Sequence, residues 1–119
     1  IQVQPNGGII MPYFGENAIH AWAQAEQSGT PSVRDSYNIS SVTDIATGRL
    51  GFNLSVAAIN NDYAFTALCG NTGTTTSARA INNDAAVTTT YFAIRMLNTN
   101  NVNSVVDEQL VNVIVVSNN

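Results

Sequence analysis

The sequence predicts an all-β fold, a small antiparallel β-sandwich or jelly-roll-like domain of seven or eight strands. Apolar and polar residues alternate with a period of two along most of the chain. Clusters of Gly, Pro, Asn, Ser and Thr interrupt this alternation at intervals of about 8 to 12 residues, as turns between short strands do. No stretch of about ten residues sustains the 3.6-residue period of an amphipathic helix.

The stretch 21–53 holds the clearest alternation, and the chain is organised around it. The first predicted strand, residues 18–25, places Ile19 and Ala21 on one face and His20 and Trp22 on the other. A turn at Ser-Gly-Thr-Pro follows. This first strand therefore begins an antiparallel sheet.

Three more strands are predicted before residue 55. Residues 33–39 alternate as a second strand, and residues 42–45 and 50–54 form a hairpin closed by the short Gly-containing loop 46–48. In this hairpin Leu50, Phe52 and Leu54 point to one side, so one face of the strand is expected to be buried.

The second half of the chain is predicted to hold four further strands joined by Asn- and Thr-rich segments. We expect strands at 63–70, 76–81, 88–96 and 111–116, loops at 71–75 and 98–103, and a single helical turn at 105–110. The residues expected to be among the most buried are Phe52, Phe65, Phe92, Ile94 and Val113.

The pentapeptide Ala-Ile-Asn-Asn-Asp occurs twice, at 58–62 and at 80–84. Asn and Asp tolerate the left-handed conformation and bond to their own backbone, so both copies predict turns. Their oxygens could also serve calcium, and five residues are too few to indicate a repeat fold. Ordinary turn chemistry remains the simpler interpretation of both copies.

The last predicted strand is apolar on both faces, with Val111, Val113 and Val115 opposed to Ile114 and Val116. A strand with two apolar faces is expected to be covered on both sides. A domain of this size has too few elements for that, so the second covering layer is expected from another subunit.

The chain divides into an extended lead-in, residues 1–18, and a sandwich domain, residues 19–119. The lead-in is rich in Pro and Gly, but its run Ile9–Phe14 is too apolar for a free linker. We expect this run to pack against the domain or against a neighbouring chain. Because the sequence begins with Ile rather than Met, we also expect a fragment of a longer polypeptide.

Charge and composition narrow the function. Charged residues make up 10% of the chain, and the net charge of −4 provides no basic face for a nucleic acid. No apolar run approaches the roughly 20 residues of a membrane span, so membrane insertion is not expected. A surface of amides and hydroxyls responds little to salt and pH, and it suits an extracellular or virion-surface protein.

The sequence offers little for catalysis. A nucleophile needs a base, and the one histidine, His20, lies within a predicted strand beside apolar residues. One His and the one cysteine, Cys69, are too few for a zinc-type site, and most carboxylates stand singly. We therefore predict no catalytic residue, no metal and no cofactor. His20 and Cys69 are expected to be structural, and Trp22 is expected to anchor a core or interface rather than stack on a sugar.

Several scaffold motifs resemble a domain found at the ends of tail fibres and tailspikes of tailed bacteriophages, marine and cyanobacterial phages in particular. The resemblance covers about residues 21–65 and 104–116 and leaves the middle of the chain unmatched. It is carried by Ala21-Trp22, Gly29-Thr30-Pro31, the run Arg34–Asp44, Gly48 with Phe52, Asn61-Asp62-Tyr63-Ala64, and the closing run Val106–Val116.

This resemblance implies a trimeric, non-enzymatic domain of the phage particle that binds a host cell-surface glycan or receptor. The alternative is a structural virion protein, such as a head-decoration or fibre-assembly domain, and a depolymerase is the third possibility. The expected partners are further copies of the same chain and other virion proteins. The expected trimer interface comprises Ile10, Tyr13, Phe14, Trp22, Ile114 and Val116. Neutral amides and hydroxyls match sugar hydroxyls, so the expected binding residues are Asn71, Thr72, Thr74, Thr75, Asn98, Asn100 and Asn101.

Overall fold

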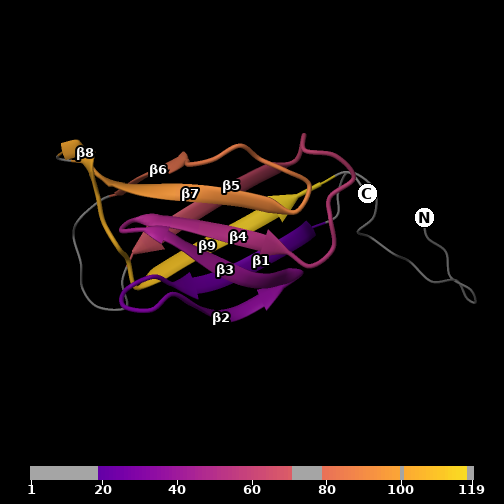
Figure 1. Cartoon of the computed structure of the whole chain (residues 1–119), viewed down its shortest axis with the longest axis horizontal. Helices are drawn as coiled ribbons and strands as arrows, with labels where there is room; N and C mark the ends of the chain where they lie inside the picture. The colour runs from indigo at the N-terminus through magenta and orange to yellow at the C-terminus, as the bar shows by residue number, and fades with distance from the viewer. Residues whose placement is uncertain (1–18, 71–78, 100, 118–119) are drawn as a thin grey trace, which may run out of the picture.

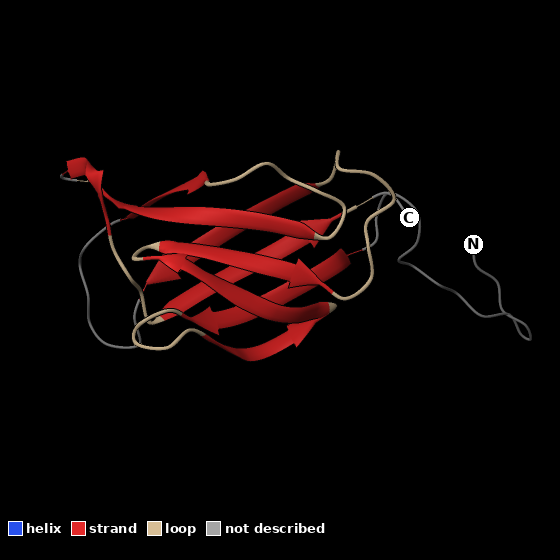
Figure 2. Ribbon diagram, in the orientation of Figure 1, coloured by secondary structure: helices blue, strands red, loops and turns tan. Residues whose placement is uncertain are grey.

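The computed structural model describes residues 19–70, 79–99 and 101–117, with the backbone alone for 101–104. The described residues form strands and connecting segments without a helix (Figure 2). The strands are β1 (Ile19–Glu26), β2 (Ser32–Tyr37), β3 (Ile39–Ala46), β4 (Arg49–Leu54), β5 (Ala64–Gly70), β6 (Arg79–Asn83), β7 (Tyr91–Asn98), β8 (Asn101–Val105) and β9 (Leu110–Val116).

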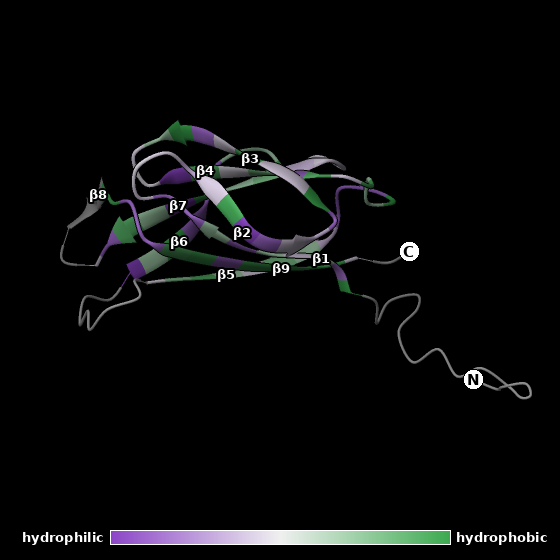
Figure 3. Cartoon of the chain, turned by 90° about the horizontal axis from the view of Figure 1, so that it is seen from below, coloured by the Kyte–Doolittle hydropathy of each residue, from purple (hydrophilic) through white to green (hydrophobic). Residues whose placement is uncertain are grey.

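Two antiparallel sheets of four strands stack on each other (Figure 1), so the predicted sandwich is confirmed. The first, here called the β9 sheet, has the strand order β2-β1-β9-β5. The second, the β7 sheet, has the order β3-β4-β7-β6. These two orders include eight strands. The short β8 pairs with the end of β7 and is not part of either order. Figure 3 shows the two layers from another side, and the core residues lie between them.

The core forms where the inward-facing residues of the two sheets meet. The β9 sheet contributes small and β-branched side chains, and the β7 sheet contributes large ones, so the two layers interdigitate. Phe52 and Phe92 stack across β4 and β7 with ring centroids 5.2 Å apart. The fully buried apolar side chains are Ala21, Ala25, Leu50, Phe52, Phe92, Ala93, Ile94, Met96, Val111 and Val115.

Four of the five predicted core residues are buried, and Phe65 is the exception. Phe65 is only partly buried, although its ring contacts Phe92 with centroids 4.5 Å apart. It lies on β5, the last strand of the β9 sheet, and the sandwich is open beside it. The alternation gave its direction correctly but not its position at an edge.

The start of β1 differs from the predicted alternation. The pairing of β1 with β9 shifts register between Ile19 and Ala21, and this irregularity exchanges the expected faces. Ile19 is consequently exposed like Trp22, and His20 is buried like Ala21, whereas the alternation paired Ile19 with Ala21 and His20 with Trp22.

The predicted strand at 33–39 is broken at Asn38, which has a positive φ of 58°. Asn is among the few residues that tolerate this conformation. It separates β2 from β3, and these two strands belong to different sheets. One residue therefore makes the first crossing between the layers.

The predicted hairpin of β3 and β4 is confirmed, with Thr47 and Gly48 at its turn. Gly48 has a positive φ of 68°, and a Cβ there would collide with the backbone of Val106. Gly is required at this turn for both reasons.

Three local predictions in the second half are wrong. The second pentapeptide copy, 80–84, lies largely in β6 rather than in a turn, whereas the first copy does form a bend. The predicted loop 98–103 is instead the end of β7 followed by β8. The predicted helical turn at 105–110 is instead the end of β8, the irregular segment 106–109 and the start of β9. Bonds from Gly48 N to Asp107 Oδ1 and from Val106 N to Met96 O hold this segment.

Candidate interaction surfaces

The predicted binding residues fall mostly outside the described part of the chain. Asn71, Thr72, Thr74, Thr75 and Asn100 lie outside the described residues. Asn98 ends β7 and Asn101 begins β8, and the two are paired across that hairpin. The structure therefore places two of the seven together, in a hairpin rather than a loop.

The predicted interface residues divide in the same way. Ile10, Tyr13 and Phe14 precede the described residues, whereas Trp22, Ile114 and Val116 all lie on the outer surface of the β9 sheet. Trp22 on β1 pairs directly with Ile114 on β9.

An apolar face covers this outer surface at the end where β1 begins. It consists of Ile19, Trp22, Tyr37, Ile114 and Val116, all exposed. Leu68 on β5 is also exposed, but it lies in the next row, opposite Asn112. Cross-strand pairing joins the residues of the apolar face into two rows, one running from Tyr37 through Trp22 to Ile114 and one joining Ile19 to Val116. Trp22 remains 38% exposed and Ile114 46%. Scattered apolar residues are common on surfaces, but contiguous ones indicate an interaction site.

Charge appears only towards the other end of the same surface, among the described residues. Gln24 lies opposite Asp35, and Glu26 forms an ion pair with Arg34. The Arg34 guanidinium, which bonds to the Glu26 carboxylate, lowers the pKa of that carboxyl. The surface of the β9 sheet thus runs from apolar at one end to charged at the other.

Within the single chain, β9 is covered on one face only, and the cover expected from another subunit stays a prediction. Val111, Val113 and Val115 are buried, while Ile114 and Val116 on the opposite face are exposed. The strand is central in its sheet, so its neighbours cover its edges but not its outer face.

The outer surface of the β7 sheet has a different character, and its centre is an ion-pair cluster. The Asp84 side chain is 1% exposed and accepts bonds from Arg49 Nε at 3.0 Å and from Arg95 Nε at 2.7 Å. Arg49 and Arg95 are cross-strand neighbours on β4 and β7. Asp84 compensates for placing two like charges opposite each other, and it attaches the chain beyond β6 to the sheet.

Tyr91 lies beside this cluster. Its ring covers Gly51 so closely that a Cβ at Gly51 would overlap the Tyr91 hydroxyl and ring carbons. Burial raises the pKa of the Tyr91 hydroxyl, and the Asp84 charge raises it further. Here glycine is required by close contact, with an aromatic ring held flat against the strand.

His20 is part of a structural network. Its Nε2 lies 3.0 Å from the Val56 carbonyl oxygen and 3.2 Å from Asn38 Nδ2. Asn38 Nδ2 also donates to the His20 carbonyl, and Asn38 Oδ1 accepts from Val56 N. These bonds fasten the β2–β3 crossing to the segment after β4, so the ring has a role in holding the chain together.

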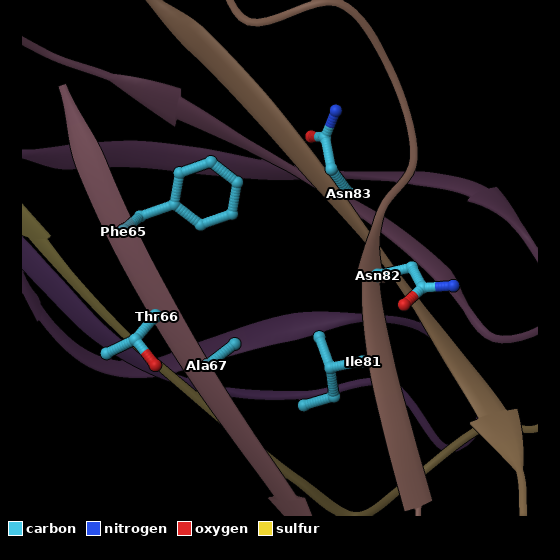
Figure 4. Close-up of a pocket in the computed structure, with 6 residues that line it drawn as sticks. All are labelled: Phe65, Thr66, Ala67, Ile81, Asn82 and Asn83. Carbon is cyan, nitrogen blue, oxygen red and sulfur yellow. The ribbon is translucent and has the colours of Figure 1, made fainter. Parts of the chain in front are cut away.

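A cavity of about 280 Å³ opens between β5 and β6, where the two sheets part. Its lining consists of Phe65, Thr66, Ala67, Ile81, Asn82 and Asn83. Figure 4 shows Phe65 and Ala67 from β5 and Ile81 from β6 pointing towards one another across this space. The sequence contains no signal for this cavity, because local alternation does not indicate where two sheets part.

Cys69 lies on the same strand and is partly buried. Desolvation, with a smaller contribution from the Glu108 charge, raises the pKa of its thiol to about 11. A thiol with so high a pKa is a poor nucleophile near neutral pH.

The described residues contain no group of three or more His, Cys, Asp or Glu side chains placed to hold a metal ion. They also contain no helix long and apolar enough to cross a membrane. Comparisons with protein-family models, with curated proteins and with solved structures found no match to the chain.

Proposed function

We propose that this chain is a non-enzymatic domain of a phage particle, at the distal end of a tail fibre or tailspike. It assembles as a homotrimer and binds a glycan or receptor on the host cell surface. The observation that carries the proposal is the apolar face of the β9 sheet, where Trp22, Ile114 and Val116 are contiguous and exposed.

Self-association is the simplest way to cover this face. Every copy carries the same apolar surface, and burying it would contribute roughly 25 cal/mol per Å² of apolar area. The charged pair Glu26–Arg34 lies at the other end of the sheet, so the apolar rows can be buried without desolvating it. The number of copies, three, comes from the resemblance of the scaffold motifs to phage fibre domains.

Glycan binding is proposed for surfaces rich in neutral amides and hydroxyls. Each hydrogen bond to a sugar hydroxyl contributes only about 0.5–1.5 kcal/mol net, so a single site is weak. Several copies on one particle supply avidity through effective concentration. We expect a monovalent dissociation constant in the millimolar range or weaker, with little dependence on salt because few ions are displaced.

The alternative is a structural virion protein, either a head-decoration or a fibre-assembly domain. The same apolar face favours it, because assembly alone accounts for that surface without any ligand. Imaging of phage particles labelled with an antibody to this domain separates the two: a signal at the tail tip supports the proposal, and a regular array over the head supports the alternative.

Sedimentation of the purified chain at micromolar concentration tests the assembly. We expect a trimer for the wild type and a monomer for Ile114→Ser, which makes the centre of the apolar face polar. Ile59→Ser is the matched control, because Ile59 is 67% exposed and belongs to the segment between β4 and β5. It should leave the trimer intact. A stable wild-type monomer would refute the proposed assembly.

Titration with host surface polysaccharide, at low and at high salt, tests the binding. Weak affinity that salt does not change is expected. Submicromolar affinity at a single site, or a steep loss with salt, would contradict the proposed mode of recognition.

A further inference from the structure

The β5 edge differs from the other three sheet edges in carrying no feature that would prevent strand pairing. β2 carries Arg34 and Asp35 and an irregular register, β3 has two register shifts, and β6 is five residues long and begins with Arg79. Edge strands are normally protected by such charges, irregularities or shortness.

β5 has seven residues, Ala-Phe-Thr-Ala-Leu-Cys-Gly, without charge or proline. It pairs with β9 in unbroken register from Ala64 to Gly70, and within the described chain nothing pairs with its other side. Its inward residues Phe65, Ala67 and Cys69 are only partly buried, and the cavity against Ile81 lies directly beside them. Both the backbone and the core are therefore incomplete along this edge.

An additional strand paired with β5 would satisfy the unpaired backbone of this edge and would complete the core beside it. One of its faces would cover the cavity between Phe65 and Ile81, and the other would continue the outer surface beside Leu68, which is 71% exposed. Such a strand must be apolar on both faces and of a length similar to β5.

The lead-in run Ile-Ile-Met-Pro-Tyr-Phe, residues 9–14, has this character. With a period of two, Ile9, Met11 and Tyr13 fall on one face and Ile10 and Phe14 on the other. Its proline is compatible with an outermost strand, since proline lacks only an N–H that would point to solvent there. The same proline would prevent a further strand from pairing.

We propose that the β5 edge receives residues 9–14 of a neighbouring copy as an added antiparallel strand. The donor is a neighbour because the link to Ile19 is short. Ile19 pairs with Val116 and Val116 with Ala64, so β1 and β5 begin at the same end of the sheet. Reaching its own β5 edge would require the link 15–18 to cross three strand spacings, about 14 Å.

That span is close to the limit of the chain. The five Cα–Cα steps from residue 14 to residue 19 reach about 17 Å when fully extended. The link would also have to turn at both of its ends, which a nearly extended segment cannot do. A neighbouring copy has no such restraint, and head-to-tail exchange of this kind closes into a ring. The inference rests on the proposed self-association but not on the apolar face or on glycan binding.

Hydrogen exchange of the intact chain tests strand addition. In the wild-type assembly, amides of β5 that β9 leaves unpaired should be protected. In the triple variant Ile9→Ser/Met11→Ser/Tyr13→Ser those amides should exchange at least about tenfold faster, with β1 and β7 unchanged. The matched control Gln2→Ser/Gln4→Ser/Asn6→Ser, in polar positions of the same lead-in, should retain the protection.

Disulfide trapping identifies the donor copy. In a Cys69→Ser background, Thr66→Cys on β5 is combined with a cysteine at each of positions 9 to 14 in turn. Directly opposed residues of antiparallel strands lie within disulfide reach. Covalent dimers and trimers on a non-reducing denaturing gel are the expected result from at least one position.

Each of the other possible outcomes would contradict one step of the proposed strand exchange. Intramolecular disulfides alone would show that the donor is the same copy. A wild-type trimer whose β5 amides exchange as fast as in the triple variant, or the absence of cross-links from all six positions, would refute strand addition while leaving the proposed function standing. A wild-type monomer would refute the self-association on which both proposals depend.

Discussion

The outer surfaces of the two sheets differ although their inner surfaces form one core. On the β9 sheet, Trp22, Tyr37 and Ile114 form an uninterrupted apolar row. On the β7 sheet, the corresponding central positions carry Arg49 and Arg95, which share the carboxylate of Asp84. Trp22 and Ile114 lie on the central strands of one sheet, and Arg49 and Arg95 lie on the central strands of the other. The difference therefore does not follow from the sandwich architecture.

The difference indicates which of the two outer surfaces is suited to remain exposed to solvent. The β7 surface is complete within one chain, because its buried carboxylate is paired and the Tyr91 ring covers Gly51. The β9 surface leaves its apolar rows uncovered, and the open β5 edge adjoins it. A surface that is incomplete in the single chain is the one expected to meet another copy.

The largest expected change in stability tests whether the two sheets share one core. Phe92 is fully buried, and its ring contacts Phe52, Phe65 and Tyr63. Phe92→Ala should lower the free energy of unfolding by about 3–5 kcal/mol, through lost burial and the cavity left behind. Urea unfolding measures this, with Tyr37→Ala on the apolar face as the control. A Phe92→Ala midpoint close to that of Tyr37→Ala would disprove the shared core.

A smaller effect tests the completeness of the β7 surface. Asp84→Asn removes the charge between Arg49 and Arg95, and it leaves two like charges opposite each other. We expect a loss of about 1–3 kcal/mol, towards the lower value because both guanidinium groups are partly exposed and can rehydrate. Thermal unfolding of Asp62→Asn, an exposed carboxylate, supplies the comparison and should change by less than about 0.5 kcal/mol. Equal losses in both variants would mean that the cluster contributes nothing.

The sequence predicted the fold class because the information is local. The alternation of Leu50, Phe52 and Leu54, and of Phe92, Ile94 and Met96, gave the inward faces of β4 and β7 correctly. Gly48 marked the hairpin because only glycine suits its conformation and the close approach of Val106.

The errors arose where partners distant in sequence decide the structure. His20 is buried because a register shift against β9 turns it inward, and nothing near residue 20 encodes that shift. The two identical pentapeptides adopt different structures because only the second pairs with β7. For the same reason, the sequence predicted Trp22 and Ile114 as interface residues but could not show that they are adjacent.

The smallest effect concerns Cys69, a partly buried residue on the inner face of β5. We call the opening between β5 and β6, where the two sheets part, the seam. The pKa of the Cys69 thiol is raised from 9.0 to about 11, mainly by burial, so the folded chain favours the protonated form. The stability that this group contributes is therefore complete below about pH 9 and is lost as the pH rises towards 11.

Since the side chain is only partly buried, solvent screening limits this contribution to about 1 kcal/mol or less. The pKa values of Tyr63 and Tyr91 are also raised, but both tyrosines are present in either protein, so the difference between the wild type and Cys69→Ser isolates the thiol. We expect the urea midpoint of the wild type to fall more steeply between pH 9 and pH 10.5 than that of Cys69→Ser. Parallel pH profiles would mean that the seam admits water freely, and the β5 edge would then be a solvated margin rather than an unfinished part of the core.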